Sequence, residues 1–395
     1  MEMRFRTIAG LAAAGLLGWA TIAGADDAIE ERVTALEEKL AFDFGAVTYG
    51  SYQYNFNEPD SGVNSLRSLD PEHNSFTFDL FQLQLAKEGP GGVGFGAKLD
   101  FGKTARRVAS DWNGDGALSD SEETNDFEAQ DVYLTYAPEW AGGVSLKAGK
   151  FATLLGAEVI EAPSNPNFTR SFLFGFAIPF THTGVLFSAP LGEMVTLNAG
   201  VVNGWDNVVD NNDGKTFLGG VGITPAENIA IYLNGVFGPE KTDSGSDPRG
   251  VVDLVTTLGF DPVSLSFNFD YGSEGSAAPD GGDATWIGFA GIVGFDLRSA
   301  ADLPLGVFLR GEVFDDQDGA RTGTEQTLTE VTGTLKCYLT ENLTLWAEFR
   351  HDWSGEDSFE EEGSITVVDP ILGPTTTAKF TDSQDTALIA LSYAF

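Results

Sequence analysis

From residue 42 to the end of the chain, apolar and polar residues alternate in segments of roughly ten residues. In the segment 264–271, for example, every second residue from Leu265 to Tyr271 is apolar and the residues between them are polar. A repeat of two residues is typical of a β-strand with one apolar and one polar face. The pattern therefore predicts an all-β fold for residues 42–395.

About sixteen such segments can be recognised. They lie near 44–56, 75–87, 93–102, 128–137, 144–151, 181–189, 194–202, 216–224, 229–238, 250–260, 264–271, 285–296, 305–314, 327–338, 343–351 and 386–395. In the second segment apolar residues fall on both faces, since Phe76 and Phe78 are followed by Phe81 and Leu83. A β-bulge would explain this change of register.

The connections between these segments alternate between short and long. Short turns such as 87–92 and 339–342 alternate with long loops such as 103–127 and 152–180. A transmembrane antiparallel β-barrel has short turns on one rim and long loops on the other, whereas a soluble β-sandwich shows no such alternation. A barrel of about sixteen strands is too wide for side chains to fill, so an aqueous channel is expected.

The charge and cysteine content exclude several other classes of protein. The chain has 22 Lys+Arg against 59 Asp+Glu, a formal net charge of -37, which opposes binding to nucleic acid. Its one cysteine, Cys337, excludes a disulfide scaffold and a cysteine-ligated zinc site. The histidines are scattered, and His182 has no evident acid partner for hydrolase chemistry. No catalytic residues are predicted.

The first forty-one residues differ from the rest. Arg4 and Arg6 precede an apolar run, and a small-residue site ends at Ala25, as in a secretory signal peptide covering residues 1–25. In the segment 26–41 the apolar residues are spaced 4, 3, 4, as in a coiled coil. Either several chains associate through this short periplasmic helix, or it lies singly on a neighbouring surface.

A set of short motifs lies in the middle of the chain. They are GKF at Gly149–Phe151, Gly156 with Glu158, NPNFTRS at Asn165–Ser171, PFTHTGV at Pro179–Val185, VVNGWD at Val201–Asp206 and DNNDGK at Asp210–Lys215. Through these motifs the middle of the chain resembles the OmpL-like outer-membrane porins. The resemblance implies a barrel that passes small solutes through the outer membrane of a Gram-negative bacterium. Separately, the last segment is apolar at alternate positions and ends in Phe395, an ending that resembles the signal recognised by the barrel-assembly machinery. A homotrimer is a further expectation.

Ionised residues on the polar faces of the strands are expected to line the pore. Strand parity points these side chains inward. They carry both signs of charge and would set the ion preference of the channel. The predicted lining residues are Lys98, Asp100, Lys147, Asp270, Arg310, Glu312, Lys336, Glu348 and Arg350.

The third long loop, about 152–180, is too apolar for a loop in water. It either folds into the lumen or packs against a neighbouring subunit. If it folds inward, Glu158, Glu161 and Arg170 are the candidates for the pore constriction. Acidic and basic groups facing each other there would create a field that favours small polar solutes.

The second long loop contains DWNGDGALSDSE at 111–122, the spacing of an EF-hand calcium loop. The predicted ligands are Asp111, Asn113, Asp115, the backbone carbonyl of Ala117 and Glu122. No long helices flank the loop, so a paired EF-hand domain is excluded, and a solvated acidic turn remains the alternative.

Three functions remain open. The first is a porin for passive diffusion of small hydrophilic solutes with a mild preference for cations, since an acidic rim concentrates them. A channel selective for sugar or phosphate is the second, and a calcium-ordered surface or adhesion barrel without transport is the third.

Overall fold

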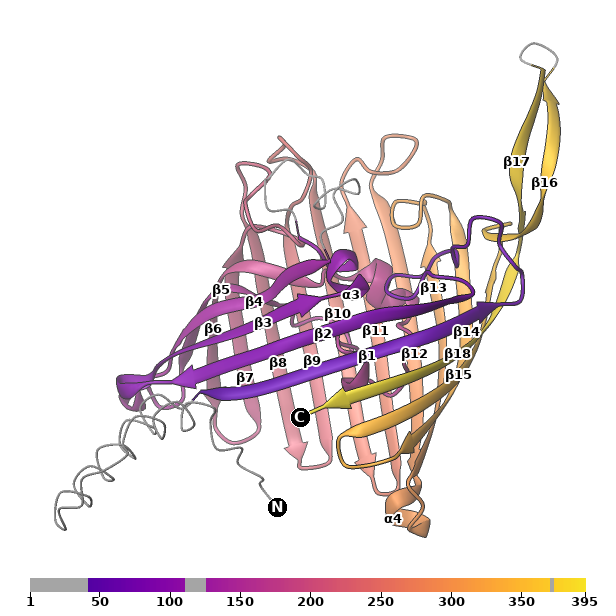
Figure 1. Ribbon diagram of the computed structural model, residues 1–395. Coiled ribbons are helices and arrows are strands. Elements are labelled where there is room, and N and C mark those ends of the chain that lie inside the picture. The colour runs from indigo at the N-terminus through magenta and orange to yellow at the C-terminus, as the bar shows by residue number, and fades with distance from the viewer. Residues whose placement is uncertain (1–41, 111–125, 370–372) are drawn as a thin grey trace, which may run out of the picture.

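The computed structural model describes residues 42–110, 126–369 and 373–395, and its strands form a closed antiparallel barrel of sixteen (Figure 1). Each barrel strand pairs with its neighbours in sequence, except that β18 pairs with β15 on one side and with β1 on the other. The barrel strands are β1 (Asp43–Asn55), β2 (Ser75–Glu88), β3 (Val93–Phe101), β4 (Phe127–Tyr136), β5 (Ser145–Ala152), β6 (Thr181–Leu191), β7 (Val195–Val202), β8 (Thr216–Ala226), β9 (Ile229–Pro239), β10 (Pro248–Phe260), β11 (Val263–Glu274), β12 (Ala284–Asp296), β13 (Leu305–Asp316), β14 (Gln326–Tyr338), β15 (Leu343–Ser354) and β18 (Ser383–Ala394).

The last long loop carries a hairpin of its own. Strands β16 (Phe359–Asp369) and β17 (Gly373–Thr381) pair only with each other and extend beyond the barrel (Figure 1). The sequence pattern did not predict these two strands, because they are not part of the repeating barrel and their polar residues do not alternate with a clear apolar face.

The helices are short and lie in the connections. They are the 3-10 turns η1 (Pro90–Gly92), η2 (Glu139–Ala141) and η3 (Ala162–Ser164), the π-turn η4 (Leu173–Ala177), and the α-helices α3 (Lys103–Arg107) and α4 (Leu297–Ala301). No helix among the described residues has the length and apolar character needed to span a membrane.

The barrel confirms the fold that the alternating pattern predicts. The ambiguous second segment contains a bulge, since the register of β1 against β2 shifts where Tyr49 pairs with Leu80 and Gly50 with Phe78. Asp79 is the extra residue, and Phe76, Phe78, Phe81 and Leu83 consequently share one face of the barrel.

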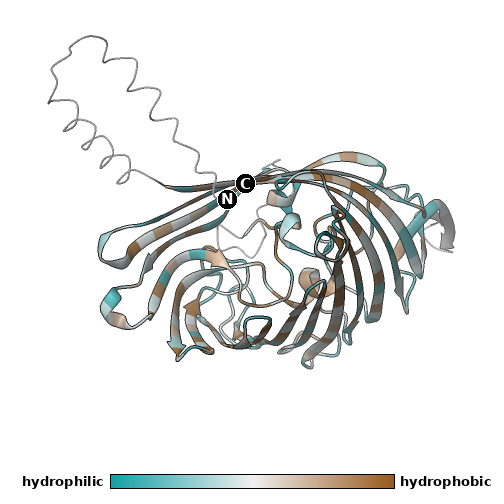
Figure 2. Cartoon of the chain, turned by 90° about the horizontal axis from the view of Figure 1, so that it is seen from below, coloured by the Kyte–Doolittle hydropathy of each residue, from teal (hydrophilic) through white to brown (hydrophobic). Residues whose placement is uncertain are grey.

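The outer face of the barrel is apolar. Along the strands, hydrophobic and hydrophilic residues alternate (Figure 2). Large exposed apolar side chains recur around the barrel, for example Leu134 on β4, Phe187 on β6, Leu233 on β9, Phe289 on β12 and Phe349 on β15. This is the surface that hydrocarbon covers in an outer-membrane barrel.

Both ends of the barrel sequence lie on one rim. The backbone of Phe395 exchanges hydrogen bonds with Ala46, with N–O distances of 3.0 and 3.1 Å, so the last residue takes part in closing the barrel. The even strand number places the start of β1 and the end of β18 on the rim that carries the short turns. This rim is here called the short-turn rim, and the opposite rim is called the long-loop rim.

Three predicted features lie outside the described residues. They are the signal peptide at 1–25, the helix at 26–41 and the calcium loop at 111–122.

Candidate functional site

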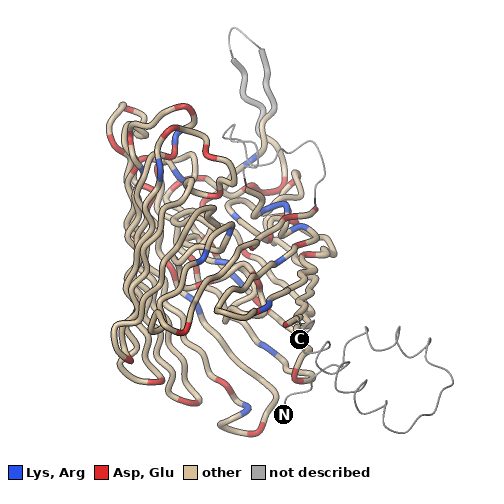
Figure 3. Tube along the Cα trace, turned by 90° about the vertical axis from the view of Figure 1, so that its left-hand side faces the viewer, with Lys and Arg blue, Asp and Glu red and all other residues tan. Residues whose placement is uncertain are grey.

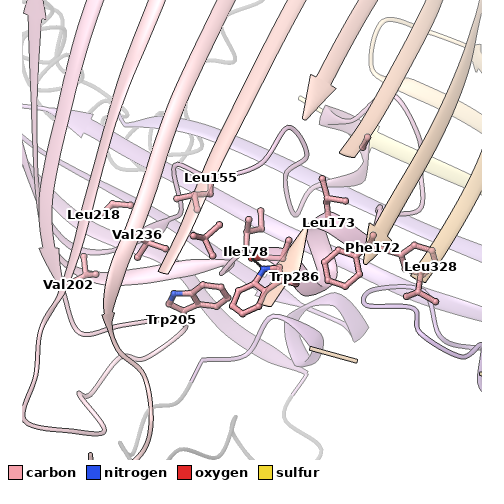
Figure 4. Close-up of a cluster of buried hydrophobic side chains, with 14 of the residues drawn as sticks. Leu155, Phe172, Leu173, Ile178, Val202, Trp205, Leu218, Val236, Trp286 and Leu328 are labelled. Carbon is pink, nitrogen blue, oxygen red and sulfur yellow. Dashed lines mark hydrogen bonds between the residues drawn. The ribbon is translucent and has the colours of Figure 1, made fainter. Parts of the chain in front are cut away.

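The loop at 153–180 connects β5 to β6 and folds into the lumen of the barrel; it is here called the inner loop. Its residues Phe172 and Leu173 pack in an apolar cluster with Trp286 of β12, which projects inward (Figure 4). The other members of the cluster are Phe151, Leu155, Ala177, Ile178, Leu186, Val202, Trp205, Leu218, Val236, Val251, Ala290, Phe314, Leu328 and Phe359. The apolar loop is therefore buried within the lumen, which decides between the two positions that its composition allows.

Two wall carboxylates hold the backbone of the inner loop. Glu312 of β13 accepts hydrogen bonds from the backbone N–H groups of Phe172 and Leu173, at 2.7 and 2.5 Å. Glu348 of β15 accepts from Phe168 and Thr169, at 2.7 and 3.0 Å. Each carboxylate thus binds two consecutive amides, and charged acceptors make stronger hydrogen bonds than neutral ones.

Two wall arginines bind the same loop. Arg310 of β13 donates to Glu158 at 2.7 Å and to the carbonyl of Thr169 at 2.6 Å. Arg350 of β15 donates to the carbonyl of Arg170 at 2.6 Å. Together with the two carboxylates, these arginines fix the path of the loop across the lumen.

The three predicted constriction residues do not form one facing set. Glu158 pairs with Arg310, and Glu161 pairs with Lys98 of β3 at 2.6 Å. Arg170 turns back on its own loop and donates to the carbonyls of Val159, Ile160 and Phe168. The counter-charges of the two glutamates therefore come from the wall, not from Arg170.

Glu161 is enclosed by donors. Its Oε1 accepts hydrogen bonds from Gln82 and Gln130 as well as from Lys98, at 2.9, 3.2 and 2.6 Å. Burial alone would raise the pKa of Glu161, but the charge and hydrogen bonds of Lys98, with the bond from Gln82, lower it. Glu161 is thus held as a carboxylate beside Lys98.

The predicted lining residues face the lumen, but only some meet open space. Lys98 and Lys147 are half-buried, and the Lys147 ammonium lies 4.4 Å from the ring centre of Tyr133. The residues covered by the loops are Asp100, Asp270, Arg310, Glu312, Lys336, Glu348 and Arg350. This differs from the expected row of water-exposed charges, because parity specifies the direction of a side chain and not what a loop places in front of it.

Sequence reasoning missed the part that the first long loop plays. Arg67 of that loop is buried, and it pairs with Asp70 and with Asp352 of β15, both at 2.7 Å. Asp352 also accepts from Arg350 at 2.5 Å. Nothing in the spacing of Arg67 distinguishes it from the solvated charges of other loops.

The VVNGWD stretch holds the end of the inner loop in place. Asp206 accepts from the backbone N–H groups of Phe180 and Thr181, at 2.9 and 2.8 Å. Burial raises the pKa of Asp206 to about 6, and these two hydrogen bonds oppose that shift. The resemblance marked this stretch, but only the structure connects it to the inner loop.

Gly204 and Glu240 lie in contact next to Asp206 and shape the same stretch of backbone. Gly204 has φ +135°, and a Cβ there would lie 2.6 Å from a carboxylate oxygen of Glu240, so glycine is required. Glu240 accepts hydrogen bonds from the backbone N–H of Trp205 at 2.8 Å and from the Thr216 hydroxyl at 2.7 Å. Burial raises its pKa to about 7.

A cavity of about 120 Å³ lies between the inner loop and the wall formed by β3 and β4. It is lined by Lys98, Gln130, Ala152, Thr153, Leu154, Leu155, Gly156, Glu158, Val159, Ile160, Glu161, Phe174, Pro179 and Phe180. Among the described residues, no group of three or more His, Cys, Asp or Glu side chains is placed to hold a metal ion.

A closed sixteen-stranded barrel with an apolar exterior, charged residues facing inward and a loop folded into its lumen defines an outer-membrane porin. The chain belongs to the family described as "Putative beta-barrel porin-2, OmpL-like", whose model matches residues 41–395. The membership places the protein in the outer membrane of a Gram-negative bacterium.

Solved porins share this fold at low identity. The anion-selective porin from Comamonas acidovorans is 11% identical, with 90% of this chain and 99% of that chain covered and a TM-score of 0.55. The outer-membrane channel DcaP of Acinetobacter baumannii is also 11% identical, covering 90% and 97% with a TM-score of 0.57. OprB of Pseudomonas putida is 10% identical, covering 92% and 96% with a TM-score of 0.57. No curated protein matches the sequence.

Proposed function

We propose that this porin is a general diffusion pore for small hydrophilic solutes and ions, with a mild preference for cations. The observation that carries the preference is the excess of acidic groups, 59 Asp+Glu against 22 Lys+Arg, together with their position in the long loops (Figure 3). A negative rim raises the local concentration of cations and repels anions.

The described long loops expose many carboxylates and few cations. The exposed carboxylates are Glu58, Asp60, Asp126, Asp213, Asp243, Asp280, Asp283, Glu325, Glu356, Asp357, Glu362 and Asp382. Exposed basic groups of the same rim and its hairpin are Arg107, Lys215 and Lys379. A cation approaching this rim therefore meets attraction before it enters the lumen.

Reversal potentials in planar bilayers with asymmetric KCl test the proposal. The expected permeability ratio of K⁺ to Cl⁻ is above one, and it should fall when Asp280→Asn, Asp283→Asn and Glu325→Gln are combined. The matched control combines Glu193→Gln, Glu227→Gln and Glu341→Gln, three exposed acids on the short-turn rim, and should change the ratio less. A wild-type ratio below one would contradict the cation preference.

A surface or adhesion barrel without transport is the second candidate. The inner loop and the apolar cluster occupy part of the lumen, which favours this alternative. Liposome swelling with small sugars separates the two, since a barrel without transport produces no swelling. A channel selective for sugar or phosphate would swell liposomes with one class of solute only.

We also propose a homotrimer, since the outer membrane protein OmpT of Vibrio cholerae, a structural neighbour at 9% identity, is described in a trimer form. The size of the complex in mild detergent tests this assembly.

Recognition by the barrel-assembly machinery through the terminal residue is a separate proposal. If it holds, Phe395→Ala should reduce the amount of folded protein in the membrane. The signal peptide at 1–25 and the helix at 26–41 stay predictions, and sequencing the mature N-terminus tests the cleavage site.

A further inference from the structure

We propose that the cavity beside the inner loop binds zwitterionic amino acids with apolar side chains as they pass through the pore. This inference rests on the proposed diffusion function, because a solute reaches the cavity through the lumen. It names a substrate class for a site that the general function does not specify.

The size of the cavity allows a small molecule. Its volume is about 120 Å³. A single water needs roughly 10–15 Å³ by the same measure, so the space exceeds what one ordered water fills. A solute with a short, branched side chain is of the right order.

One side of the cavity is apolar. Leu154, Leu155, Ile160, Phe174, Pro179 and Phe180 form it. The Phe174 and Phe180 rings lie 5.1 Å apart and make a continuous apolar surface. A sugar placed against this wall would leave hydroxyl groups without hydrogen-bond partners, whereas an aliphatic side chain would be removed from water.

The other end of the cavity carries an ion pair. Lys98 contacts Glu161 at 2.6 Å, and the Lys98 side chain is 31% exposed while that of Glu161 is 6% exposed. An ammonium group has three N–H donors, and one of them goes to Glu161. The exposed part of Lys98 can therefore donate to the carboxylate of a solute.

The surrounding charges favour a solute that also carries an ammonium group. Asp131 is the cross-strand partner of Lys98, and Asp100 lies two residues further on the same face of β3. With Glu161 these are three formal negative charges against the two of Lys98 and Lys147, and the lining residue Glu158 adds no net charge because it is paired with Arg310. A solute with only a carboxylate would increase this negative excess, but a zwitterion leaves it unchanged.

Reduction of the single-channel ion current by added solute tests the inference. We expect L-leucine to reduce the current at about tenfold lower concentration than glycine, 4-methylpentanoate or 3-methylbutylamine, which lack the side chain or one of the charges. Equal reduction by either singly charged compound, or by glycine, would overturn the assignment to apolar zwitterions.

Two variants and a control locate the effect. Lys98→Met should weaken the effect of leucine about tenfold, while Glu161 keeps its hydrogen bonds from Gln82 and Gln130, so the inner loop stays attached. Phe180→Ala should weaken it through the apolar wall. Ser188→Ala, on β6 and outside the cavity lining, should leave it unchanged.

The outcomes separate this inference from the general function. Absence of any ion current through the folded wild-type barrel contradicts the diffusion pore itself. Current that leucine reduces no more than glycine does, or reduces equally in Lys98→Met and wild type, overturns only the amino-acid site. Thermal unfolding of each variant in detergent shows that the barrel has folded.

Discussion

Arg310 and Glu158 form a buried ion pair, with 2.7 Å between Nη1 and Oε1, that joins the barrel wall to the inner loop. Their side chains are 0% and 4% exposed, so water screens the pair little. Arg310 also pairs with Glu330 of β14 at 2.6 Å. The position of the inner loop therefore depends on Arg310 more than on Glu158 or Glu330.

We predict that Arg310→Met destabilises the barrel more than Glu158→Gln does. Removing Arg310 leaves Glu158 and Glu330 buried without this cation, and breaking a buried pair costs about 3–5 kcal/mol. Glu158→Gln keeps the contact of Arg310 with Glu330. Thermal unfolding in detergent measures the stability, and single-channel recordings should show more current noise in Arg310→Met. Equal unfolding temperatures for the two variants would contradict this ranking.

A second prediction concerns the attachment of the loop backbone. Glu348→Ala leaves the N–H groups of Phe168 and Thr169 without their acceptor, at a cost of about 1–3 kcal/mol for each group that stays buried. The loop should then detach locally, with faster hydrogen exchange at 168–169 and a larger conductance. Mass spectrometry of exchanged peptides measures the first effect. The control Glu356→Ala, an exposed carboxylate of the long-loop rim, should leave the hydrogen exchange at 168–169 unchanged.

The stability of the long-loop rim should decrease as the pH rises from about 4 to about 7. The pKa of Glu240 is raised from 4.5 to about 7 and that of Asp206 from 3.8 to about 6, so the folded state binds these protons more tightly than the unfolded state. The stabilisation is complete below the unfolded pKa values and is lost as each group ionises in the folded protein. For Glu240 the change is on the order of 3 kcal/mol.

Limited proteolysis at pH 5 and pH 8 measures this dependence, and cleavage within 203–215 should be slower at pH 5 after correction for protease activity. Glu240→Gln mimics the protonated side chain and should reduce the difference in cleavage between pH 5 and pH 8. An unchanged pH dependence in Glu240→Gln would assign it to other groups.

The acidic loop at 111–122 is predicted from its sequence to bind Ca²⁺ with a Kd of roughly 10⁻⁴–10⁻³ M, as in extracellular modules. Calorimetry of the refolded barrel, after removal of metal with a chelator, should show calcium binding that Glu122→Gln weakens. Asp126→Asn, beyond the motif, is the matched control. Lack of calcium heat in the wild type would leave the alternative of a solvated acidic turn.

Much of the barrel follows from local pattern. The segment 264–271 predicts a strand because a repeat of two residues can be recognised from adjacent residues alone. The bulge at Asp79 was visible as a change of apolar face between Phe78 and Phe81. The hairpin β16–β17 was not predicted because its two strands pair only with each other and stand outside the repeating strands of the barrel.

The contacts within the candidate site could not be predicted from local pattern. Composition indicated that 152–180 must be buried, but Glu158, Glu161 and Arg170 could not be assigned partners that lie far away in sequence. Glu158 is 152 residues from Arg310, and Glu348 is 180 residues from Phe168. Such contacts depend on which strands closure of the barrel places opposite the loop.

The sequence alone determined the class of fold, the approximate positions of the sixteen barrel strands, the apolar exterior and the acidic character of the chain, because alternation and charge are properties of adjacent residues. Only the tertiary structure decided that Arg310, Glu312, Glu348 and Arg350 hold the inner loop and are covered by it. The physical reason is that a buried charge needs a partner within hydrogen-bond distance, and the closed barrel brings that partner from distant strands.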